Sequence, residues 1–505
     1  MAVSTRDALK REVDKLISRH NAMCRATALD RRRYERRSGL TAELPSSTEP
    51  AHWTAHPHFN PYYVHSRLDT LAHALRQKLQ AGTYQPNPIL LADIRKPGGG
   101  TRQISLLTVP DAAVSYALGT RLVERNAHFF TSYTYAYRTD RNAHHAIQHL
   151  MSELRGASRM FVLEFDFSKY FDSIEHRYLT DTLSRHFHTT TRERDLINRL
   201  LTCQRAAGIA AYTAGTFTAA TRGIPQGSTL SLFLANVACH ELDREIEREG
   251  AVFARYADDT VILCDSYEKA DRCARHIMEH GQRSGTEVNF SKSHGISVLT
   301  EQGNAEMKTK RSMTFLAHSL SAAGVGVSPK SVVRMKRKVA QIIQRHLLLQ
   351  PSRGHVNPSR LGSGFRDWDL VTCLNELRRY IYGRITEASL TAALAGSGYF
   401  NITRCALSFY PTVDLERAEV FKQLDGWLAD TLTRAYAKRV QLLASLGVTA
   451  SPLSRDEIIS GGWHSFPSVT NETRLPSFFK SWLYVRRCAR IFGLLRFPSP
   501  VYEYV

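Results

Sequence analysis

Two adjacent acids, Asp258 and Asp259, lie between two apolar runs and constrain what this chain can fold into. The flanking residues, 251–256 and 260–264, are rich in β-branched and aromatic side chains and predict two strands joined by a tight turn. Uncompensated charge in a buried hairpin is expensive, and binding divalent cations is one good reason to keep it there. A solvated Asp-Asp turn is the plain alternative, because a short string of this kind also arises by chance.

A third acid, Asp166, stands near the end of a strongly apolar run, residues 160–167, which predicts another strand. It precedes Asp258 by 92 positions (258 − 166), so one sheet can place the two strands side by side. Three carboxylates on neighbouring strand ends can hold two Mg²⁺ ions about 4 Å apart, which support an in-line phosphoryl transfer. A satisfied core carboxylate is the alternative for Asp166.

Two further segments carry groups that such chemistry needs. Lys96 and Arg102 flank the glycine-rich tip of a predicted hairpin at 97–101, where two cations can neutralise a triphosphate. Taken without further context, ordinary edge-strand charge is the preferred explanation of these two cations. Residues 222–228 (RGIPQGS) combine a rigid backbone with the amide of Gln226 and open into a predicted helix. Backbone amides at a helix N-terminus suit a phosphate or a nucleotide edge.

The net charge indicates what kind of partner the chain binds, and the cysteine usage indicates its cellular compartment. The 505 residues include 67 Lys and Arg against 47 Asp and Glu, a net charge of +20. This favours nucleic acid as the partner, with an anionic membrane surface a distant second. The eight cysteines are scattered without a CxxC pair, which fits a reducing cytoplasm. The N-terminal residues are charged and no run has the length of a membrane span, so we expect a soluble cytoplasmic protein.

The remaining pattern is mostly helical. A basic helix is predicted at 5–37, followed by a proline-rich arm at 42–61. Two more strands are predicted at 287–293 and 314–320. Helices are predicted at 66–79, 111–125, 179–205, 230–249, 267–284 and 331–349, and beyond these near 366–383, 388–395, 412–446 and 475–495.

The ordered set of segments resembles the fingers and palm of bacterial reverse transcriptases, the branch with group II intron, retron and abortive-infection or defence-associated enzymes. Residues 256–259 (YADD) are similar to the family's YxDD box, and residues 165–172 (FDFSKYFD) to its first catalytic motif. The other matching segments are 96–102, 132–145, 223–228, 289–292 and 315–318. The likeness covers about residues 66–345 in the correct order.

The resemblance implies an α+β right-hand polymerase fold with fingers, a palm built on an antiparallel sheet, and a thumb, followed by an all-α C-terminal domain. The implied divisions are a basic helical extension at 1–65, fingers and palm at 66–327, the thumb start at 328–350 and a helical thumb extension or C-terminal domain at 351–505.

The same resemblance assigns roles to individual positions. It implies metal ligation and catalysis by Asp166, Asp258 and Asp259, with Lys292 as a proton donor to pyrophosphate. It implies that Phe171 excludes a ribose 2′-OH. Nucleotide contacts are expected from Lys96, Arg102, Phe167, Phe171, Gln226 and Gly227, and primer or template contacts from Tyr256, Phe315, His318 and Arg138.

The implied function is an RNA-directed DNA polymerase that uses dNTPs and two Mg²⁺ ions, with Mn²⁺ as a substitute. Its partners would be an RNA template or non-coding RNA and a DNA product, and a homo-oligomer is compatible with the sequence. No cysteine-histidine cluster of an HNH endonuclease follows the thumb, and the long helical extension favours a role in antiphage defence by analogy. Two alternatives stay open: an untemplated or protein-primed DNA polymerase, and an RNA-binding scaffold with incidental polymerase activity.

Overall fold

The palm sheet is the centre of the fold, and every other part packs against it or extends from it. A computed structural model describes residues 4–43, 48–95, 99–290, 293, 295–301, 307–362, 366–463 and 473–498. The sheet has the strand order β10-β9-β3-β7-β6. Its strands are β3 (Arg159–Phe165), β6 (Val252–Tyr256), β7 (Asp259–Cys264), β9 (Gly295–Thr300) and β10 (Thr309–Lys310).

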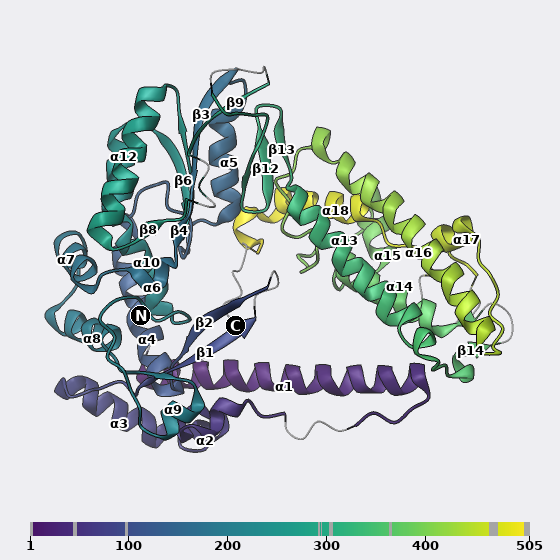
Figure 1. Cartoon of the computed structure of the whole chain (residues 1–505), viewed down its shortest axis with the longest axis horizontal. Helices are drawn as coiled ribbons and strands as arrows, with labels where there is room; N and C mark the ends of the chain where they lie inside the picture. Colours follow the sequence, from purple (N-terminus) through teal and green to yellow (C-terminus); the bar gives the residue numbers. More distant parts are fainter. Residues whose placement is uncertain are drawn as a thin grey trace.

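Each face of this sheet is covered by helices because its strands are apolar on both sides. Phe161, Phe253 and Ile262 belong to a core shared with α10 (Thr229–Ala238) and α12 (Tyr267–Ser284). Val162 and Val261, on the opposite face, join a core that includes α5 (Ala143–Leu154). Figure 1 shows α5 and α12 on the two sides of the sheet. Strands buried on both faces read as continuous apolar runs, which the sequence shows.

The fingers lie beneath the palm and carry the predicted hairpin. Strands β1 (Ile89–Arg95) and β2 (Thr101–Leu106) pair antiparallel, and β5 (Arg205–Ala207) pairs with β1 in parallel. The expectation of a hairpin around residues 97–101 is confirmed for its two strands. The surrounding helices are α2 (Pro61–Ser66), α3 (Leu68–Ala81), α4 (Val109–Asn126), α6 (Tyr170–Ser173), α7 (His176–His186), α8 (Thr191–Leu201), α9 (Ile209–Thr213) and α11 (His240–Arg248).

The sequence reading was wrong at two places in the palm. It missed β9, which pairs with β3 from Arg159↔Thr300 to Glu164↔Gly295 and is a central strand. It also took 314–320 as one strand, whereas β11 (Met313–Phe315) and β12 (His318–Ser321) form a hairpin. Leu316 and Ala317 have φ values of 45° and 65°, which make the two-residue turn. Neither residue is glycine or asparagine, so the turn gave no sequence signal.

The predicted strand 287–293 is short as well. Its described part forms only β8 (Glu287–Val288), paired with β4 (Phe167–Ser168). Two predicted helices are each divided in two: 179–205 contains α7 and α8, and 230–249 contains α10 and α11. The other helix predictions agree with the structure to within a few residues, apart from 412–446, whose helix begins at Glu419.

The thumb and the C-terminal helices form the second half of the molecule (Figure 1). They follow β13 (Gly324–Val327), and the thumb begins with α13 (Pro329–Ile343). Buried residues from the palm, the thumb and the C-terminal helices belong to one continuous core, so the boundary predicted at residue 350 stays a prediction. The remaining elements are β14 (Leu361–Gly362), β15 (Arg366–Asp367), α14 (Trp368–Tyr382), α15 (Glu387–Ala395), α16 (Glu419–Ser445), α17 (Arg455–Ser460) and α18 (Phe478–Phe492).

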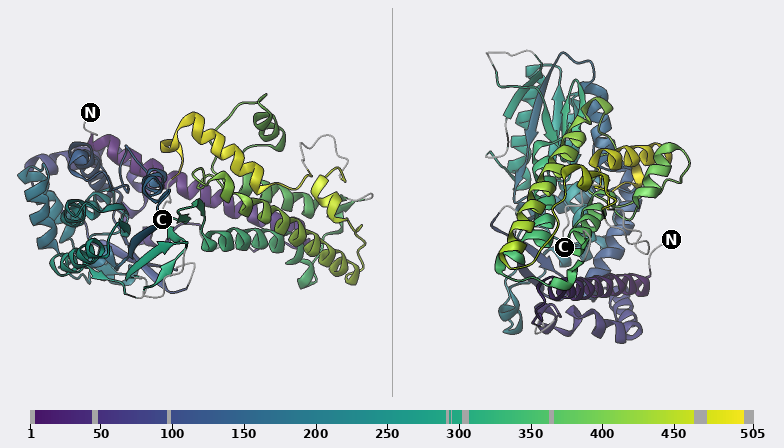
Figure 2. Two further views of the ribbon diagram at one scale, coloured as in Figure 1. Left: turned by 90° about the horizontal axis from the view of Figure 1, so that it is seen from above. Right: turned by 90° about the vertical axis from the view of Figure 1, so that its right-hand side faces the viewer.

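A single long helix, α1 (Thr5–Ser38), runs from the fingers to the far end of this helical half (Figures 1 and 2). It confirms the basic helix predicted at 5–37. Among the described residues no helix is long and apolar enough to cross a membrane.

Candidate active site

Three acids meet at one edge of the palm sheet, as the strand pattern predicts. Asp259 is the first residue of β7 and pairs with Tyr256 across the turn, while Asp258 occupies the turn itself. Phe165 pairs with Thr260, so Asp166, one residue further along, lies beside Asp259. Ala257 has a φ of 61°, which gives the tight reversal between β6 and β7. The three carboxylates are therefore neighbours on two adjacent strands.

The acids repel one another where they stand. Burial and the charges of Asp258, Asp166 and Glu164 together raise the pKa of the Asp259 carboxyl to about 7. Lys310 forms an ion pair with Glu164 at the edge of this group. A bound cation would offset the repulsion, because metal ions bind the ionised carboxylates.

The donor chemistry of this cluster fits Mg²⁺, which prefers carboxylate oxygens. Asp166, Asp258 and Asp259 would hold it, as the sequence predicts. Within the part of the chain that the structure describes, no three Asp, Glu, His or Cys side chains are grouped tightly enough to hold a metal ion. The predicted metal site therefore stays a prediction.

A buried arginine behind the catalytic turn fixes its backbone. The Arg255 side chain is fully buried and donates to both carboxylate oxygens of Asp243, at 2.7 and 2.6 Å. It also donates to the Ala257 carbonyl at 3.1 Å, to the Asn236 amide oxygen at 3.1 Å and to the Thr134 hydroxyl at 3.3 Å. Burial alone would lower the pKa of Arg255, but the Asp243 carboxylate raises it above its usual value. The charged pair thus reaches directly into the Tyr256–Asp259 turn.

The RGIPQGS segment is held against the first catalytic motif by backbone contacts. The Gly223 amide donates to the Ile174 carbonyl at 2.8 Å, and the Ile224 amide donates to the Phe171 carbonyl at 2.6 Å. Gly223 has a φ of 82°, and a Cβ there would lie 2.7 Å from the Asp172 carbonyl oxygen. Only glycine fits this approach, which accounts for the residue type.

Gln226 links the fingers to the palm. Its amide nitrogen donates to Asp172 at 3.0 Å, and its amide oxygen accepts from Arg102 at 3.0 Å. The Ser105 amide donates to the Gln226 carbonyl at 3.2 Å. Two predicted nucleotide ligands, Arg102 on β2 and Gln226, are therefore brought together. Their contact with a nucleotide stays a prediction.

The other residues predicted to contact a nucleotide lie in different surroundings. Phe171 is buried next to Tyr170, and its position directly before Asp172 brings it close to Gln226. The Phe167 ring stacks on Tyr170 in the palm core, so it has a packing role in this structure. Gly227, with a φ of 110°, lies over β2. Lys96 and Lys292 fall outside the described residues. Nucleotide contacts by Phe167, Phe171 and Gly227 stay predictions.

The predicted primer and template residues are mostly buried. Phe315 and His318 are fully buried on either side of the β11–β12 turn, and burial lowers the pKa of His318 to about 4. Tyr256 is 7% exposed in the palm core. Arg138 forms a two-pronged pair with Asp140, with both distances at 2.9 Å. Contacts of these four residues with nucleic acid stay predictions.

Sequence reasoning missed four residues that shape the site. Arg255 and Asp172 were not predicted, because the sequence around an arginine or an acid does not show which residue elsewhere in the chain it binds. The Leu316 amide donates to Asp259, which places the β11–β12 turn at the catalytic acids. Phe290 is 72% exposed, beside Asn289, whose amide donates to the Asp166 carbonyl at 2.8 Å. An exposed phenylalanine next to a catalytic motif was a usable signal.

Replacing Asp243 with Ala is expected to destabilise the fold by about 3–5 kcal/mol, because it leaves a buried guanidinium uncompensated. The measurement is denaturant unfolding of the purified chain. Asp265→Ala is the matched control: this acid pairs with Lys269 on the surface at 2.8 Å, and its loss should cost at most a few tenths of a kcal/mol. Equal effects of the two substitutions would contradict the role given to the buried pair.

The family comparison covers the region just described. Residues 94–320 match the family model described as reverse transcriptase (RNA-dependent DNA polymerase). This range includes the fingers hairpin, the three acids and the β11–β12 turn.

Curated relatives agree with the match. Protein YkfC of Escherichia coli is 30% identical over 206 residues, which is 40% of this chain and 52% of that protein. The group II intron-encoded protein LtrA of Lactococcus lactis is 28% identical over 186 residues, 37% of this chain and 30% of that protein. The chain thus spans about half or less of the length of these relatives.

A solved telomerase of Candida albicans, in complex with a fragment of telomeric RNA, is similar over 81% of this chain and 68% of that one, with a TM-score of 0.40 and 11% identity. A likeness of this size adds nothing to the assignment, which the sequence matches carry. These matches identify residues 94–320 as a reverse transcriptase domain, and part of the chain is similar to a bacterial group II intron-encoded protein.

Proposed function

We propose that the protein is an RNA-directed DNA polymerase that extends a primer with dNTPs by two-metal nucleotidyl transfer. The observation that carries this is the gathering of Asp166, Asp258 and Asp259 on adjacent strand ends, within a reverse transcriptase domain. Reverse transcriptases in general use divalent metal ions. The net charge of +20 supports a polyanionic substrate.

The side chains around the acids suit the individual tasks of the reaction. Mg²⁺ bound by the three carboxylates would supply a Lewis acid for the attacking and leaving oxygens. Arg102 can pair with the triphosphate of an incoming nucleotide, since its guanidinium already reaches the palm through Gln226. Asp172 accepts from the Gln226 amide nitrogen and so fixes the orientation of this amide between the fingers and the palm. The bulk of Phe171 would exclude a ribose 2′-OH and so favour dNTPs.

Asp258→Asn and Asp259→Asn are each expected to lower dNTP incorporation on an RNA template by about a thousandfold or more. A bound metal ion supplies several kcal/mol of charge stabilisation, and each tenfold in rate is about 1.4 kcal/mol. Asp265→Asn, at the other end of β7, should incorporate dNTPs at the wild-type rate. Both catalytic-site variants should melt at or above the wild-type temperature without metal, because they remove like-charge repulsion. Incorporation that survives either change would sink the proposal.

We further propose that an RNA partner supplies the template and that the biological role is antiphage defence. The helical half beyond the thumb supports an added function, since it shares a core with the palm and is no loose appendage. Sequencing of nucleic acid that copurifies with the protein tests this. One recurring RNA together with DNA complementary to it is the expected result. Protein-linked DNA without a complementary RNA would favour the protein-primed alternative instead.

A further inference from the structure

The helix α1 has two packed ends and an unpacked middle. Its 34 residues span about 51 Å. Near its start, Ala8, Leu9 and Val13 are buried against the fingers in a core shared with α3 and α4. Residues 21–30 are exposed apart from Cys24, which is half-buried. Arg37 and Ser38, in the last turn, are buried again.

A helix whose middle is exposed can bridge two parts of a protein, and the middle of α1 is exposed although it carries apolar residues such as Met23 and Leu29. Local features keep this one helical without packing. Ser4 caps the N-terminus, Gly39 caps the C-terminus in a left-handed conformation, and Arg31 pairs with Glu35 at 2.8 Å. The middle of α1 thus spans the distance between the two packed ends with most of its side chains exposed.

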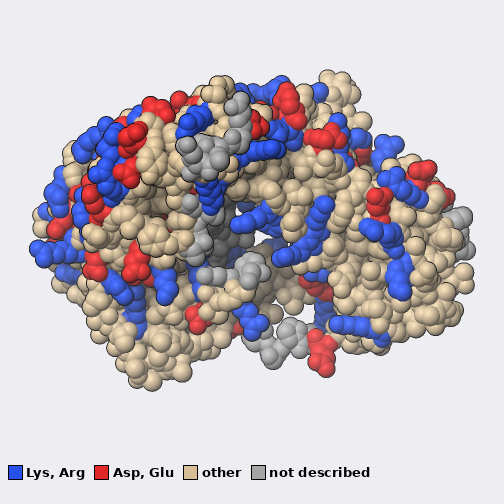
Figure 3. Space-filling model, turned by 45° about the horizontal axis from the view of Figure 1, so that its top comes forward, with Lys and Arg blue, Asp and Glu red and all other residues tan. Residues whose placement is uncertain are grey.

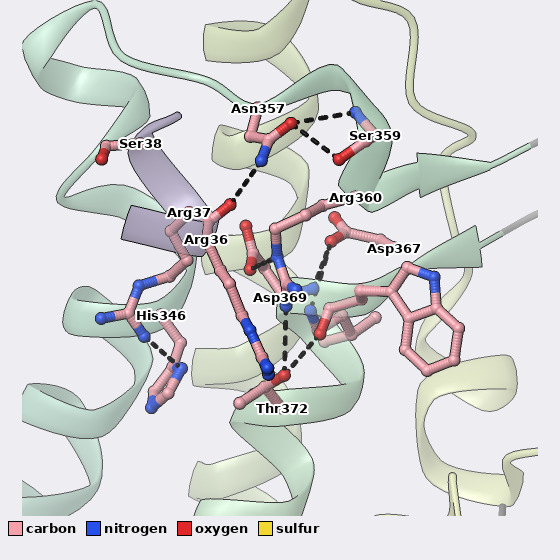
Figure 4. Close-up of polar contacts among 12 residues, drawn as sticks. Arg36, Arg37, Ser38, His346, Asn357, Ser359, Arg360, Asp367, Asp369 and Thr372 are labelled. Carbon is pink, nitrogen blue, oxygen red and sulfur yellow. Dashed lines mark hydrogen bonds and ion pairs between the residues drawn. The ribbon is translucent and has the colours of Figure 1, made fainter. Parts of the chain in front are cut away.

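The far end of α1 docks on the thumb through polar groups (Figure 4). The Arg37 guanidinium donates to Nδ1 of the buried His346 at 3.0 Å. Because Nδ1 accepts this bond, the neutral His346 ring donates from Nε2 to Glu376, at 2.7 Å. Arg33, one turn earlier on α1, pairs with the same carboxylate at 3.1 Å. We call these four residues, together with Asn357, the latch.

Asn357 completes the latch from the loop before β14. Its side-chain amide donates to the Arg36 carbonyl at 2.8 Å and so satisfies one of the open carbonyls at the end of α1. The surface behind it is fixed, because the buried Arg439 pairs with Asp367 at 2.6 Å and Asp369 at 2.9 Å. Arg360 holds Asp369 from the other side at 2.5 Å (Figure 4).

The contact between α1 and the thumb at the latch completes a circle of packed parts around the centre of the molecule. In Figure 1 the fingers, palm, thumb and α1 follow one another around the centre of the molecule, with α13 on the thumb side of that centre. Figure 3 shows the molecule hollowed at this place, with Lys and Arg side chains around the hollow. The exposed residues of α13 from Lys330 to Lys338 are mostly basic, and one more basic residue follows in the next turn; these residues are Lys330, Arg334, Arg337, Lys338 and Arg345.

We propose that α1 closes the polymerase into a ring around its nucleic-acid duplex, and that the latch opens to admit a duplex and shuts to retain it. The proposal rests on the proposed function, which puts an RNA–DNA duplex in the central hollow. The cationic face of α13 suits the phosphates of such a duplex, whichever sequence it carries.

The two ends of α1 are held by different kinds of interaction, and this difference indicates that the latch is the end that opens. The fingers end is held by apolar burial, which does not depend on the surrounding ions. The latch consists of ion pairs and hydrogen bonds. Its Arg33–Glu376 pair is partly exposed, and pairs near a surface are weak and screened by salt, whereas Arg37 and His346 are buried. The exposed middle has few contacts to lose when the far end moves; among the described residues, Tyr62 donates to Asn21 at 3.3 Å. Opening at the thumb therefore breaks the fewest interactions.

The geometry offers a direct way to lock the ring. A Cβ placed on Gly39 would lie 3.9 Å from the Cβ of Asn357, within the range of a disulfide. The variant Gly39→Cys/Asn357→Cys should therefore form a disulfide across the latch on oxidation, and dithiothreitol should release it. The eight native cysteines are unpaired, and six of the eight are buried. The oxidised and reduced forms of one protein then differ only in whether the ring can open.

The probe is an RNA–DNA duplex with streptavidin blocking both ends, compared with the same duplex with free ends. The locked protein should load on the blocked duplex about tenfold or more slowly than the reduced protein. Protein locked after loading should stay on the blocked duplex through a high-salt wash and slide off the free-ended one. Equal loading of locked and reduced protein, or loss of the locked protein from the blocked duplex in salt, would overturn the ring.

Two controls separate the outcomes. Gly39→Cys alone carries the strained left-handed cysteine without the disulfide and should behave like the wild type in both redox states. Arg33→Ala/Arg37→Ala should load on the blocked duplex faster than Arg32→Ala/Arg36→Ala, which removes two exposed charges from the same turns. If the wild type binds both duplexes and locking has no effect, the ring is refuted and the proposed function is not. Wild-type binding to neither duplex would refute the proposed function as well.

Discussion

The buried pair between Arg255 and Asp243 is the interaction on which the catalytic end of the palm depends. Burying a guanidinium costs several kcal/mol unless every donor finds a partner in good geometry. Here the carboxylate takes two bonds, and the remaining donors reach Asn236, Thr134 and the carbonyl of Ala257. The last of these bonds lies inside the Asp258-Asp259 turn. A satisfied charge on β6 therefore fixes the backbone that carries the catalytic acids.

The three acids differ from the Arg255–Asp243 pair, because they repel one another. Asp258, Asp259 and Asp166 are brought together by strand register and repel one another, and burial together with this repulsion raises the pKa of Asp259. Nothing in the fold of the palm requires this arrangement, and it costs stability until a cation binds. Pre-organised catalysis needs a site whose charges repel one another, held by surrounding residues whose hydrogen bonds are all made. At Gln226 the amide is likewise fixed by two partners, Asp172 and Arg102.

Much of this was readable from the sequence, and the exceptions share one cause. The YADD turn, the strand before Asp166, the fingers hairpin and nearly all helices follow from apolar periodicity and glycine placement. The central strand β9 was missed although Ile296, Val298 and Leu299 give it an apolar pattern. The partners of Arg255, and those of Arg33 and Arg37 more than 300 residues away, could not be read, because local patterns carry no information on distant contacts. The single core shared by palm and thumb was hidden for the same reason.

Metal affinity tests the central claim most directly, since the claim is that the Arg255 pair holds the catalytic acids in place to bind cations. Mn²⁺ binding to the purified chain can be followed by electron paramagnetic resonance of the free ion, for the wild type and for Arg255→Lys. Lysine keeps the charge but cannot reach Asp243, Asn236 and Ala257 together. The account predicts that a folded Arg255→Lys variant binds Mn²⁺ about 10–100-fold more weakly than the wild type. Equal affinity of the two proteins would contradict it.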